Sequence, residues 1–287
     1  MFRQKCAVIA NQKMTAPGHF ILKLRNPLIS SKARPGQFVQ ILCADTTDPL
    51  LPRPFSFLTA GAKDFSILYQ VVGKGTELLS RKKKGDAVWA VGPLGNGFTL
   101  AGSKDLFRSL LVGGGVGIPP LVHLAEELLK KKVKKENIHV FLGARNKSLL
   151  LCEKDFKKLG VYLHIATDDG SKGSKGFVTK ILEEFISSDL KIFTCGPTPM
   201  LKAVSAVAHK HKIPCEVSVE EPMACGFGAC LGCAIKVKNQ GDRRRETGYK
   251  NTYPVSRILS PEYPSSECRF AIACTEGPVF NSEDIVW

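Results

Sequence analysis

Three cysteines in one short glycine-rich segment have a spacing that suits iron–sulfur chemistry. Cys225, Cys230 and Cys233 follow the pattern C-x4-C-x2-C, the plant-type spacing of [2Fe–2S] ligands, in which a fourth cysteine comes from elsewhere in the chain. Thiolates are soft and negatively charged, and the small residues between them let the loop wrap around the sulfides with its amides directed at them. Zinc is the competing metal, because C-x2–4-C pairs fit part of the pattern. Three cysteines in a single tight loop favour the cluster.

Two later cysteines are candidates for the fourth ligand. Cys268 and Cys274 both lie beyond the loop, and spacing alone does not separate them. Four other cysteines stand singly in apolar or alternating segments, and we expect them to be buried structural thiols: Cys6, Cys43, Cys152 and Cys215.

A second motif is the glycine-rich run at residues 113–120, which joins an expected strand to an expected helix. Its glycines are Gly113, Gly114, Gly115 and Gly117. Glycine lets a backbone approach a pyrophosphate closely, and a helix N-terminus supplies amides and a positive dipole. The run departs from GxGxxG, and no acidic residue ends the next expected strand to bind a ribose. We expect the turn to bind a nucleotide cofactor.

Two short motifs in the first third of the chain could bind another phosphate-containing cofactor. The first combines an arginine fork, a rigid proline and a hydroxyl donor; it consists of Arg53, Pro54, Phe55 and Ser56. The second runs from an expected strand into a glycine turn and contains Leu68, Tyr69, Gln70, Gly75 and Thr76. Its aromatic ring could stack on a flavin, while the turn amides and the hydroxyl hold a pyrophosphate.

The elements that must position these motifs change in character along the chain. Residues 1–101 contain β-prone runs at 6–10, 19–24, 37–43, 65–72 and 86–90, separated by Gly or Pro. This pattern predicts an antiparallel β-barrel. Residues 102–212 alternate expected strands (109–112, 139–142, 162–166, 191–195) with expected helices (119–132, 153–159, 177–185, 199–210). That alternation predicts a doubly wound parallel α/β sheet, and residues 213–287 are expected to form a small cysteine-rich domain.

Composition limits the class of protein without setting its function. The chain has 287 residues, 44% of them hydrophobic, and a net charge of +15. We see no apolar signal segment and no apolar stretch of about 18 residues, so we expect a cytoplasmic protein with no membrane span. The basic runs at 81–84, 130–135 and 243–245 lack interleaved aromatic residues. They therefore favour a solvated basic face over nucleic-acid binding.

The order of the motifs resembles a known superfamily. The 53–56 and 68–76 motifs resemble the flavin domain of ferredoxin reductases, and the 113–120 turn resembles their nicotinamide-binding turn. Cys195 and Gly196 begin a Cys-Gly-Pro turn, which that superfamily places beside the nicotinamide. With the cysteine loop and the segments 92–98 and 277–280, nearly the whole chain resembles the family of dihydroorotate dehydrogenase B electron-transfer subunits.

The resemblance implies a set of cofactors and a partner. It implies FAD at the 53–56 and 68–76 motifs, a [2Fe–2S] cluster with Cys274 as its fourth ligand, and NAD at the glycine turns. It also implies a heterotetramer with two copies of an FMN-containing dihydroorotate dehydrogenase catalytic subunit. Electrons would pass from that FMN through the cluster and FAD to NAD⁺, in pyrimidine biosynthesis. The hydride step needs no acid or base from the protein, so we name no catalytic residue and expect Cys195 only to position the nicotinamide.

The choice between NAD and NADP is open in the sequence. Arg145 follows one expected strand and could pair with a 2′-phosphate, whereas Asp168 and Asp169 follow the next and could accept hydrogen bonds from a ribose. We favour NAD, with Asp168 as the acceptor.

The sequence departs from the family pattern at two places, and two other functions are compatible with its motifs. Gln70 stands where the family usually has Arg, so one phosphate contact is weaker or comes from Lys74, and the stretch 236–270 is longer and more basic than expected. The same motifs serve in diaphorase subunits of hydrogenases, sulfide dehydrogenases and transhydrogenase-type complexes, which are the alternative function. A more distant alternative is an iron–sulfur redox sensor that binds nucleic acid.

Overall fold

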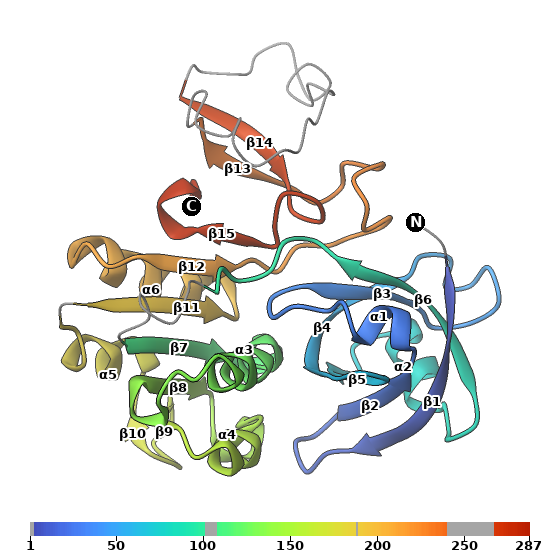
Figure 1. Ribbon diagram of the computed structural model, residues 1–287, viewed down its shortest axis with the longest axis horizontal. Coiled ribbons are helices and arrows are strands. Elements are labelled where there is room, and N and C mark those ends of the chain that lie inside the picture. The colour runs from blue at the N-terminus through green and yellow to red at the C-terminus, as the bar shows by residue number, and fades with distance from the viewer. Residues whose placement is uncertain (1–2, 101–107, 188, 240–266) are drawn as a thin grey trace.

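The computed structural model describes residues 3–100, 108–187, 189–239 and 267–287. This part of the chain contains a closed barrel, a seven-stranded sheet flanked by helices, and a two-stranded hairpin (Figure 1). The expected domain boundary at 101/102, the basic run at 243–245 and most of the stretch 236–270 lie outside the described residues. No helix within the described ranges has the length and apolar character needed to cross a membrane.

The N-terminal residues form the antiparallel barrel that the sequence predicts. Its strands are β1 (Gln4–Lys13), β2 (His19–Arg25), β3 (Phe38–Leu42), β4 (Arg53–Ala60), β5 (Asp64–Gln70) and β6 (Ala87–Leu94). Their order around the barrel is β1-β2-β5-β4-β3-β6, and β1 closes the barrel by pairing with β6. Because successive side chains of a strand point to opposite faces, Val39 and Ile41 of β3 lie in the barrel core and Phe38 packs outside it.

Two short helices in the barrel region were not predicted. They are α1 (Pro27–Ser30) and α2 (Lys74–Ser80), both too short to show a helical period in the sequence. Proline suits the first position of α1, and the Asn26 side chain caps this helix by accepting a 3.1 Å hydrogen bond from the amide of Ile29.

The second body is a mostly parallel sheet. In sheet order its strands are β10 (Ser174–Lys175), β9 (Tyr162–Thr167), β8 (Ile138–Ala144), β7 (Arg108–Gly114), β11 (Leu190–Cys195), β12 (Cys215–Ser218) and β15 (Val279–Asn281). Its helices are α3 (Pro119–Lys130), α4 (Glu153–Leu159), α5 (Val178–Glu184) and α6 (Thr198–Lys210). Short 3-10 turns are η1 (Gly115–Gly117), η2 (Lys135–Asn137), η3 (Lys147–Leu149) and η6 (Ser282–Asp284).

The helices divide between the two faces of this sheet. Leu121 of α3 and Phe156 of α4 belong to the core on one face, and Leu182 of α5 and Val204 of α6 belong to the core on the other. This arrangement confirms the predicted doubly wound fold. The strand order changes direction between β7 and β11, and in such sheets ligands bind beyond the carboxyl ends of the strands at that point.

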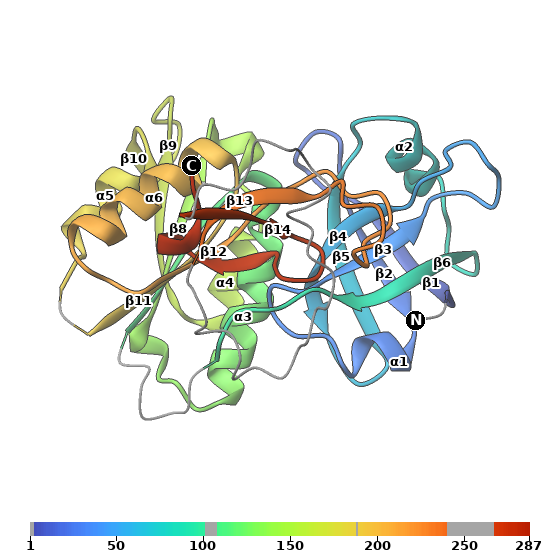
Figure 2. The same ribbon diagram turned by 90° about the horizontal axis from the view of Figure 1, so that it is seen from above.

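The chain after residue 212 contributes to the sheet as well as to a separate hairpin. Strand β12 is parallel to β11, and β15 returns antiparallel to β12. Between them, β13 (Ala234–Lys238) and β14 (Cys268–Ile272) form the hairpin. The loop from β12 to β13 extends toward the barrel and returns (Figures 1 and 2).

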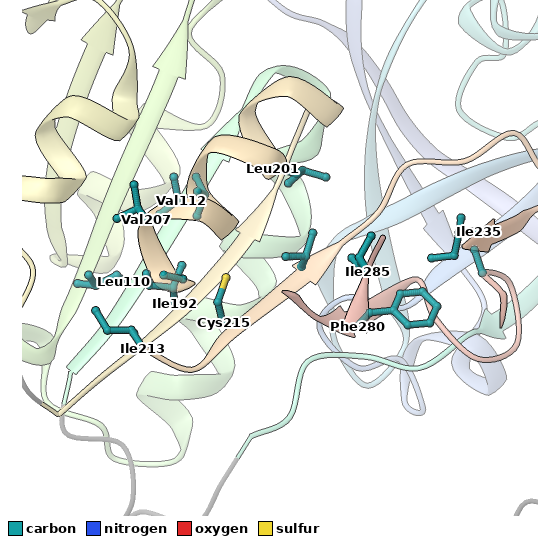
Figure 3. Close-up of a cluster of buried hydrophobic side chains, with 14 of the residues drawn as sticks. Leu110, Val112, Ile192, Leu201, Val207, Ile213, Cys215, Ile235, Phe280 and Ile285 are labelled. Carbon is teal, nitrogen blue, oxygen red and sulfur yellow. The ribbon is translucent and has the colours of Figure 1, made fainter. Parts of the chain in front are cut away.

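One continuous hydrophobic core holds the three bodies together. It contains Leu110 of β7, Ile192 of β11 and Phe280 of β15, and it continues into the hairpin at Ile235 (Figure 3). Phe38 of the barrel belongs to the same core. The cysteine-rich segment is therefore packed against both the barrel and the sheet.

Burial of His123 predicts a loss of stability in acid. This α3 side chain is 1% exposed, and burial lowers the pKa of its imidazole from 6.5 to about 4. The unfolded chain therefore binds a proton before the folded one does, so the free energy of unfolding falls as the pH drops from about 6.5 to about 4, by up to about 1.4 kcal/mol per pH unit. Urea unfolding of His123→Leu should show a weaker pH dependence than wild type across this interval. Equal pH dependence would show that His123 does not contribute.

Candidate functional site

The structure brings four cysteine thiols together at the junction of the loop and the hairpin. Cys225 and Cys230 lie at the two ends of a turn, and the amide of Cys230 donates a 3.4 Å hydrogen bond to Cys225 Sγ. Cys233 precedes β13, and Cys274 follows β14. Because these strands are paired, the amide of Cys274 reaches Cys233 Sγ at 3.4 Å. The thiols thus form two adjacent pairs.

Backbone amides point at these sulfur atoms. The amide of Gly228 donates a 3.2 Å hydrogen bond to Cys274 Sγ, which ties the second pair to the loop of the first. Gly226 and Gly228 have φ values of +79° and +86°, a left-handed conformation that glycine adopts without strain and that bends the loop around the thiols. Donors of this kind stabilise the negative charge of thiolates and of the sulfides that they would hold.

The thiols are activated by these contacts. The Cys274 thiol donates to Cys233 and lowers the pKa of Cys233 to about 6, while the pKa of Cys274 is raised in return. Partial burial raises the pKa of Cys225, but amide hydrogen bonds from Phe227 and Cys230 outweigh it and lower the pKa to about 7. Two of the four thiols are therefore readily ionised at neutral pH, as metal ligation requires.

The arrangement of the thiols fits a two-iron cluster. In the described part of the chain, no three His, Cys, Asp or Glu side chains converge closely enough to hold a single metal ion. The two adjacent thiol pairs are the donor set of a [2Fe–2S] cluster, in which four cysteines are shared by two irons. Cys268 pairs with Lys238 at the far end of the hairpin, whereas Ile272, two residues before Cys274, pairs with Ala234 beside Cys233. Four residues of strand, about 13 Å, separate Cys268 from that end.

The two expected flavin motifs meet at Arg53. This residue begins β4, and its Nη1 donates a 2.7 Å hydrogen bond to the carbonyl of Leu51. A Cβ atom added at Gly75 would lie 3.3 Å from Arg53 Nε, so the guanidinium lies directly over the start of α2. Thr76 uses its hydroxyl locally, because Oγ1 accepts from the amide of Val72 at 3.0 Å. A cation and a tight turn therefore lie together, as a pyrophosphate site requires.

The Tyr69 side chain lies in a different place from the one expected. We expected its ring to stack on a flavin, but it is 2% exposed inside the barrel, where it stacks on Phe20 with centroids 5.6 Å apart. Alternation along β5 turns Tyr69 inward and Leu68 outward, toward α3. Phe55 packs edge-on against Tyr69 at 5.8 Å. Tyr69 thus supports the 53–56 motif from inside the barrel wall.

Gln70, which stands where the family usually has Arg, and its proposed substitute Lys74 are both exposed. Gln70 itself ends β5 at the surface. Lys74, the expected substitute for a phosphate contact, forms an exposed ion pair with Asp48. A ligand phosphate would have to compete with that carboxylate for the ammonium group.

The two nicotinamide motifs interlock at their glycines. A Cβ atom added at Gly117 would lie 2.5 Å from the Gly196 amide nitrogen, and one added at Gly196 would lie 2.6 Å from Met200 Cε and 3.1 Å from the Gly114 amide nitrogen. The turn after β7 and the turn after β11 therefore approach backbone to backbone, which only glycine permits. Gly115, at φ +56°, faces open space.

Cys195 ends β11 inside this pair of turns. Its side chain is 6% exposed, and burial raises the pKa of the thiol to about 12, against the opposing effect of a hydrogen bond with Ser218. The thiol is therefore neutral at physiological pH. Gly113 lies beside it on β7.

Arg145 and Asp168 emerge side by side at the carboxyl ends of β8 and β9. The amide of Asp168 donates a 3.0 Å hydrogen bond to Ala144, the residue before Arg145. Both side chains are exposed. Asp169 is occupied locally, because its carboxylate accepts a 2.9 Å hydrogen bond from the Ser171 amide. Of the two acids, Asp168 is the better placed to bind a ribose.

Asn96 is a positioning residue whose contacts the sequence does not reveal. It lies in the 92–98 segment, and its Nδ2 donates to the carbonyls of Thr275 (3.2 Å) and Glu276 (3.0 Å). These residues follow Cys274 directly. These contacts join residues about 180 positions apart and fix Cys274 relative to the barrel. In the sequence, the local signal of such a close approach is the pair of glycines on either side of Asn96.

Comparison with protein families identifies two parts of the chain. Residues 111–206 match the oxidoreductase NAD-binding domain. Residues 220–247 match the iron–sulfur cluster binding domain of dihydroorotate dehydrogenase B.

Curated relatives match over the full length. The chain is 39% identical over 280 residues to the "Dihydroorotate dehydrogenase B (NAD(+)), electron transfer subunit" of Desulforamulus reducens, which covers 96% of this chain and 95% of that one. It is 36% identical over 288 residues, and 100% of both chains, to the protein of the same name from Bacillus caldolyticus.

Solved structures share the fold. A chain of an NADH-dependent reduced ferredoxin–NADP oxidoreductase, studied for flavin-based electron bifurcation, has a TM-score of 0.77 and 30% identity, and covers 98% of this chain and 90% of that one. The FAD/NAD-binding domain of a nitric oxide dioxygenase from Vibrio cholerae has a TM-score of 0.65 and 17% identity, with 76% and 99% covered. The second likeness concerns the fold alone.

The fold and the matched domains define an oxidoreductase subunit that joins a flavin-type barrel to an NAD-binding sheet and an iron–sulfur segment. The chain belongs to the family of electron-transfer subunits of NAD⁺-dependent dihydroorotate dehydrogenase B. The predicted family, fold class, oxidoreductase class and cofactor set of FAD, [2Fe–2S] and NAD are thereby confirmed, and the family name implies a catalytic partner subunit. The diaphorase alternative is not favoured, because identity is higher to the dihydroorotate dehydrogenase subunits.

The fourth ligand can be tested by exchanging serine for each candidate. Cys274→Ser should lose the cluster, because it removes one thiol of the Cys233 pair, whereas Cys268→Ser should keep it. Iron and sulfide analysis, with the EPR signal of the reduced protein, measures the difference. Cluster loss in Cys268→Ser but not in Cys274→Ser would reassign the ligand.

The flavin site can be tested at Arg53. Arg53→Ala should weaken FAD binding about ten- to 150-fold, since a hydrogen bond from a charged group to the pyrophosphate contributes about 1.5–3 kcal/mol. Flavin retained after dialysis and titration of the apoprotein measure the effect. Arg25→Ala is the matched control, because this exposed arginine pairs with Asp64 on the barrel. Equal FAD affinity in both variants would contradict the assignment.

Proposed function

We propose that this chain carries electrons from an FMN-containing dihydroorotate dehydrogenase catalytic subunit, through [2Fe–2S] and FAD, to NAD⁺. The proposal includes a heterotetramer with two copies of each subunit, a cytoplasmic location and a role in pyrimidine biosynthesis. The full-length relatives named for this complex support it. None of the ten cysteines is paired in a disulfide, which suits a reducing compartment.

The observation that carries the proposal is the order of the sites in space. The cluster loop packs on the outer wall of the barrel at β3, since Gly226 contacts Gln40 of that strand. Strand β3 pairs with β4, which carries the 53–56 motif. Helix α3, which follows the nicotinamide turn, packs against β4. The flavin motif therefore lies between the cluster loop and the nucleotide turn, the order that a relay needs.

The bound cofactors would supply the chemistry, one-electron transfer at the cluster and hydride exchange between flavin and nicotinamide. The residues proposed to bind FAD are Arg53, Pro54, Phe55, Ser56, Leu68, Gln70, Gly75 and Thr76, and Tyr69 is proposed to support them. Tyr69 would act from inside the barrel, by holding Phe55 in place. The cluster ligands proposed are Cys225, Cys230, Cys233 and Cys274.

The nicotinamide would lie against the interlocked turns. The residues proposed for it are Gly113, Gly114, Gly115, Gly117, Cys195 and Gly196. Cys195 would serve as a neutral, buried wall, because its raised pKa prevents a negative charge beside the ring. Exposed Asp168 would accept hydrogen bonds from the adenosine ribose and so favour NAD over NADP.

Reconstitution with the catalytic subunit tests the function. Dihydroorotate should reduce NAD⁺ only when both subunits are present, and light scattering should give the mass of two copies of each. Cys274→Ser should abolish this transfer yet retain NADH-driven reduction of ferricyanide, which needs only the flavin and nicotinamide sites. NADH formation is followed by absorbance.

Two outcomes would contradict the proposal. One is copurification from native cells with a multi-cluster flavoprotein instead of an FMN-containing dihydroorotate dehydrogenase. The other is unimpaired transfer from dihydroorotate to NAD⁺ in a Cys274→Ser complex that contains no cluster.

A further inference from the structure

Gln40 is a buried polar side chain whose amide has no hydrogen-bond partner in the part of the chain that the structure describes. It lies in the middle of β3 and is 0% exposed. Neither Nε2 nor Oε1 has a hydrogen-bond partner among the described residues. Folded proteins almost always satisfy a buried primary amide, because an unpaired one loses its hydration without replacement. Such a side chain in mid-strand therefore points to a group that the protein binds there.

The surroundings of Gln40 show which way it faces. Its neighbours Val39 and Ile41 belong to the barrel core, so Gln40 is directed outward from the barrel wall. Its cross-strand partners are Pro54 on β4 and Val91 on β6. On the β4 side, Gln40 thus lies next to the 53–56 flavin motif.

On its outward face, Gln40 contacts the loop that carries Cys225, Cys230 and Cys233. A Cβ atom at Gly226 would lie 2.6 Å from Gln40 Cγ and 2.8 Å from Nε2, so the carboxamide packs directly on the residue that follows Cys225. The loop from β12 to β13 reaches over this part of the barrel (Figures 1 and 2). Glycine is needed at 226 both for its φ of +79° and for the room that it leaves to the amide.

We infer that Gln40 is a positioning residue for the cluster, whose Nε2 donates a hydrogen bond toward the cluster sulfur on the side that faces the flavin motif. The inference rests on the proposed function, because it assumes that the four thiols hold [2Fe–2S]. A donor at this point stabilises the reduced, more negative cluster and raises its reduction potential. Gln40 thereby helps to set the driving force of the step between cluster and flavin.

Gln40→Leu tests the inference, because leucine keeps much of the side-chain volume and removes the donor. EPR-monitored redox titration of the holoprotein should show the cluster harder to reduce by about tenfold, which is 59 mV for one electron. The flavin potential should be unchanged. Gln4→Leu is the matched control: Gln4 on β1 pairs with Ala90 of the barrel core, so the same change is made on the inner face of the barrel wall, opposite to the face that carries Gln40, and no shift is expected.

A second measurement does not depend on the variant's folding. Pulsed EPR of the reduced wild-type cluster, in protein with ¹⁵N-labelled glutamine side chains, should show a coupling to a glutamine nitrogen. The Gln4→Leu protein should retain this coupling.

Three outcomes would overturn the inference: an unchanged cluster potential in Gln40→Leu, a shift of the flavin potential alone, or no glutamine coupling in wild type. Each presupposes a chain that contains its cluster. A wild-type chain without iron would instead refute the proposed function, so the two failures are distinguishable.

Discussion

Close approach of backbone segments, without side chains between them, determines where the cofactor sites lie. A Cβ atom at Gly117 would meet Gly196 at 2.5 Å, and one at Gly95 would meet the carbonyl of Gly277 at 2.7 Å. The first contact joins the two turns of the nicotinamide site. The second joins the barrel to the turn that follows the fourth cysteine. Side chains at these positions would separate the segments, and protein interiors do not absorb such displacements easily.

The cysteine-rich loop is held next to the barrel by these contacts, although the strands on either side of the C-terminal segment belong to the sheet. Strands β12 and β15 anchor both ends of the C-terminal segment in the sheet. Phe38 and Phe280 then share one core with Cys233 and Cys274. The thiols are consequently fixed relative to both nucleotide-binding bodies, which electron transfer between cofactors requires.

Elements with a local sequence signal agree with the structure, and those without one differ from it. The helix expected at 153–159 has those bounds in α4, because its apolar spacing and the following Gly160 are local signals. Helix α2 was expected to be a turn, since seven residues carry no periodic signal. Tyr69 was expected to face a flavin, and β5 instead buries it. A strand that is buried on both faces shows no alternation from which to choose the inward side.

The sequence by itself determined the types of chemistry and their order, because cysteine spacing, glycine turns and strand–helix alternation are local patterns. It also determined the family, since those motifs occur together, in the family's order, along nearly the whole chain. Only the tertiary structure placed Cys274 rather than Cys268 beside Cys233, and Gln40 against Gly226. Such contacts join residues about 40 to 190 positions apart, and they arise from strand register and loop packing that no local pattern encodes. The cysteine spacing predicts the type of cluster, and the fold determines which residues surround it.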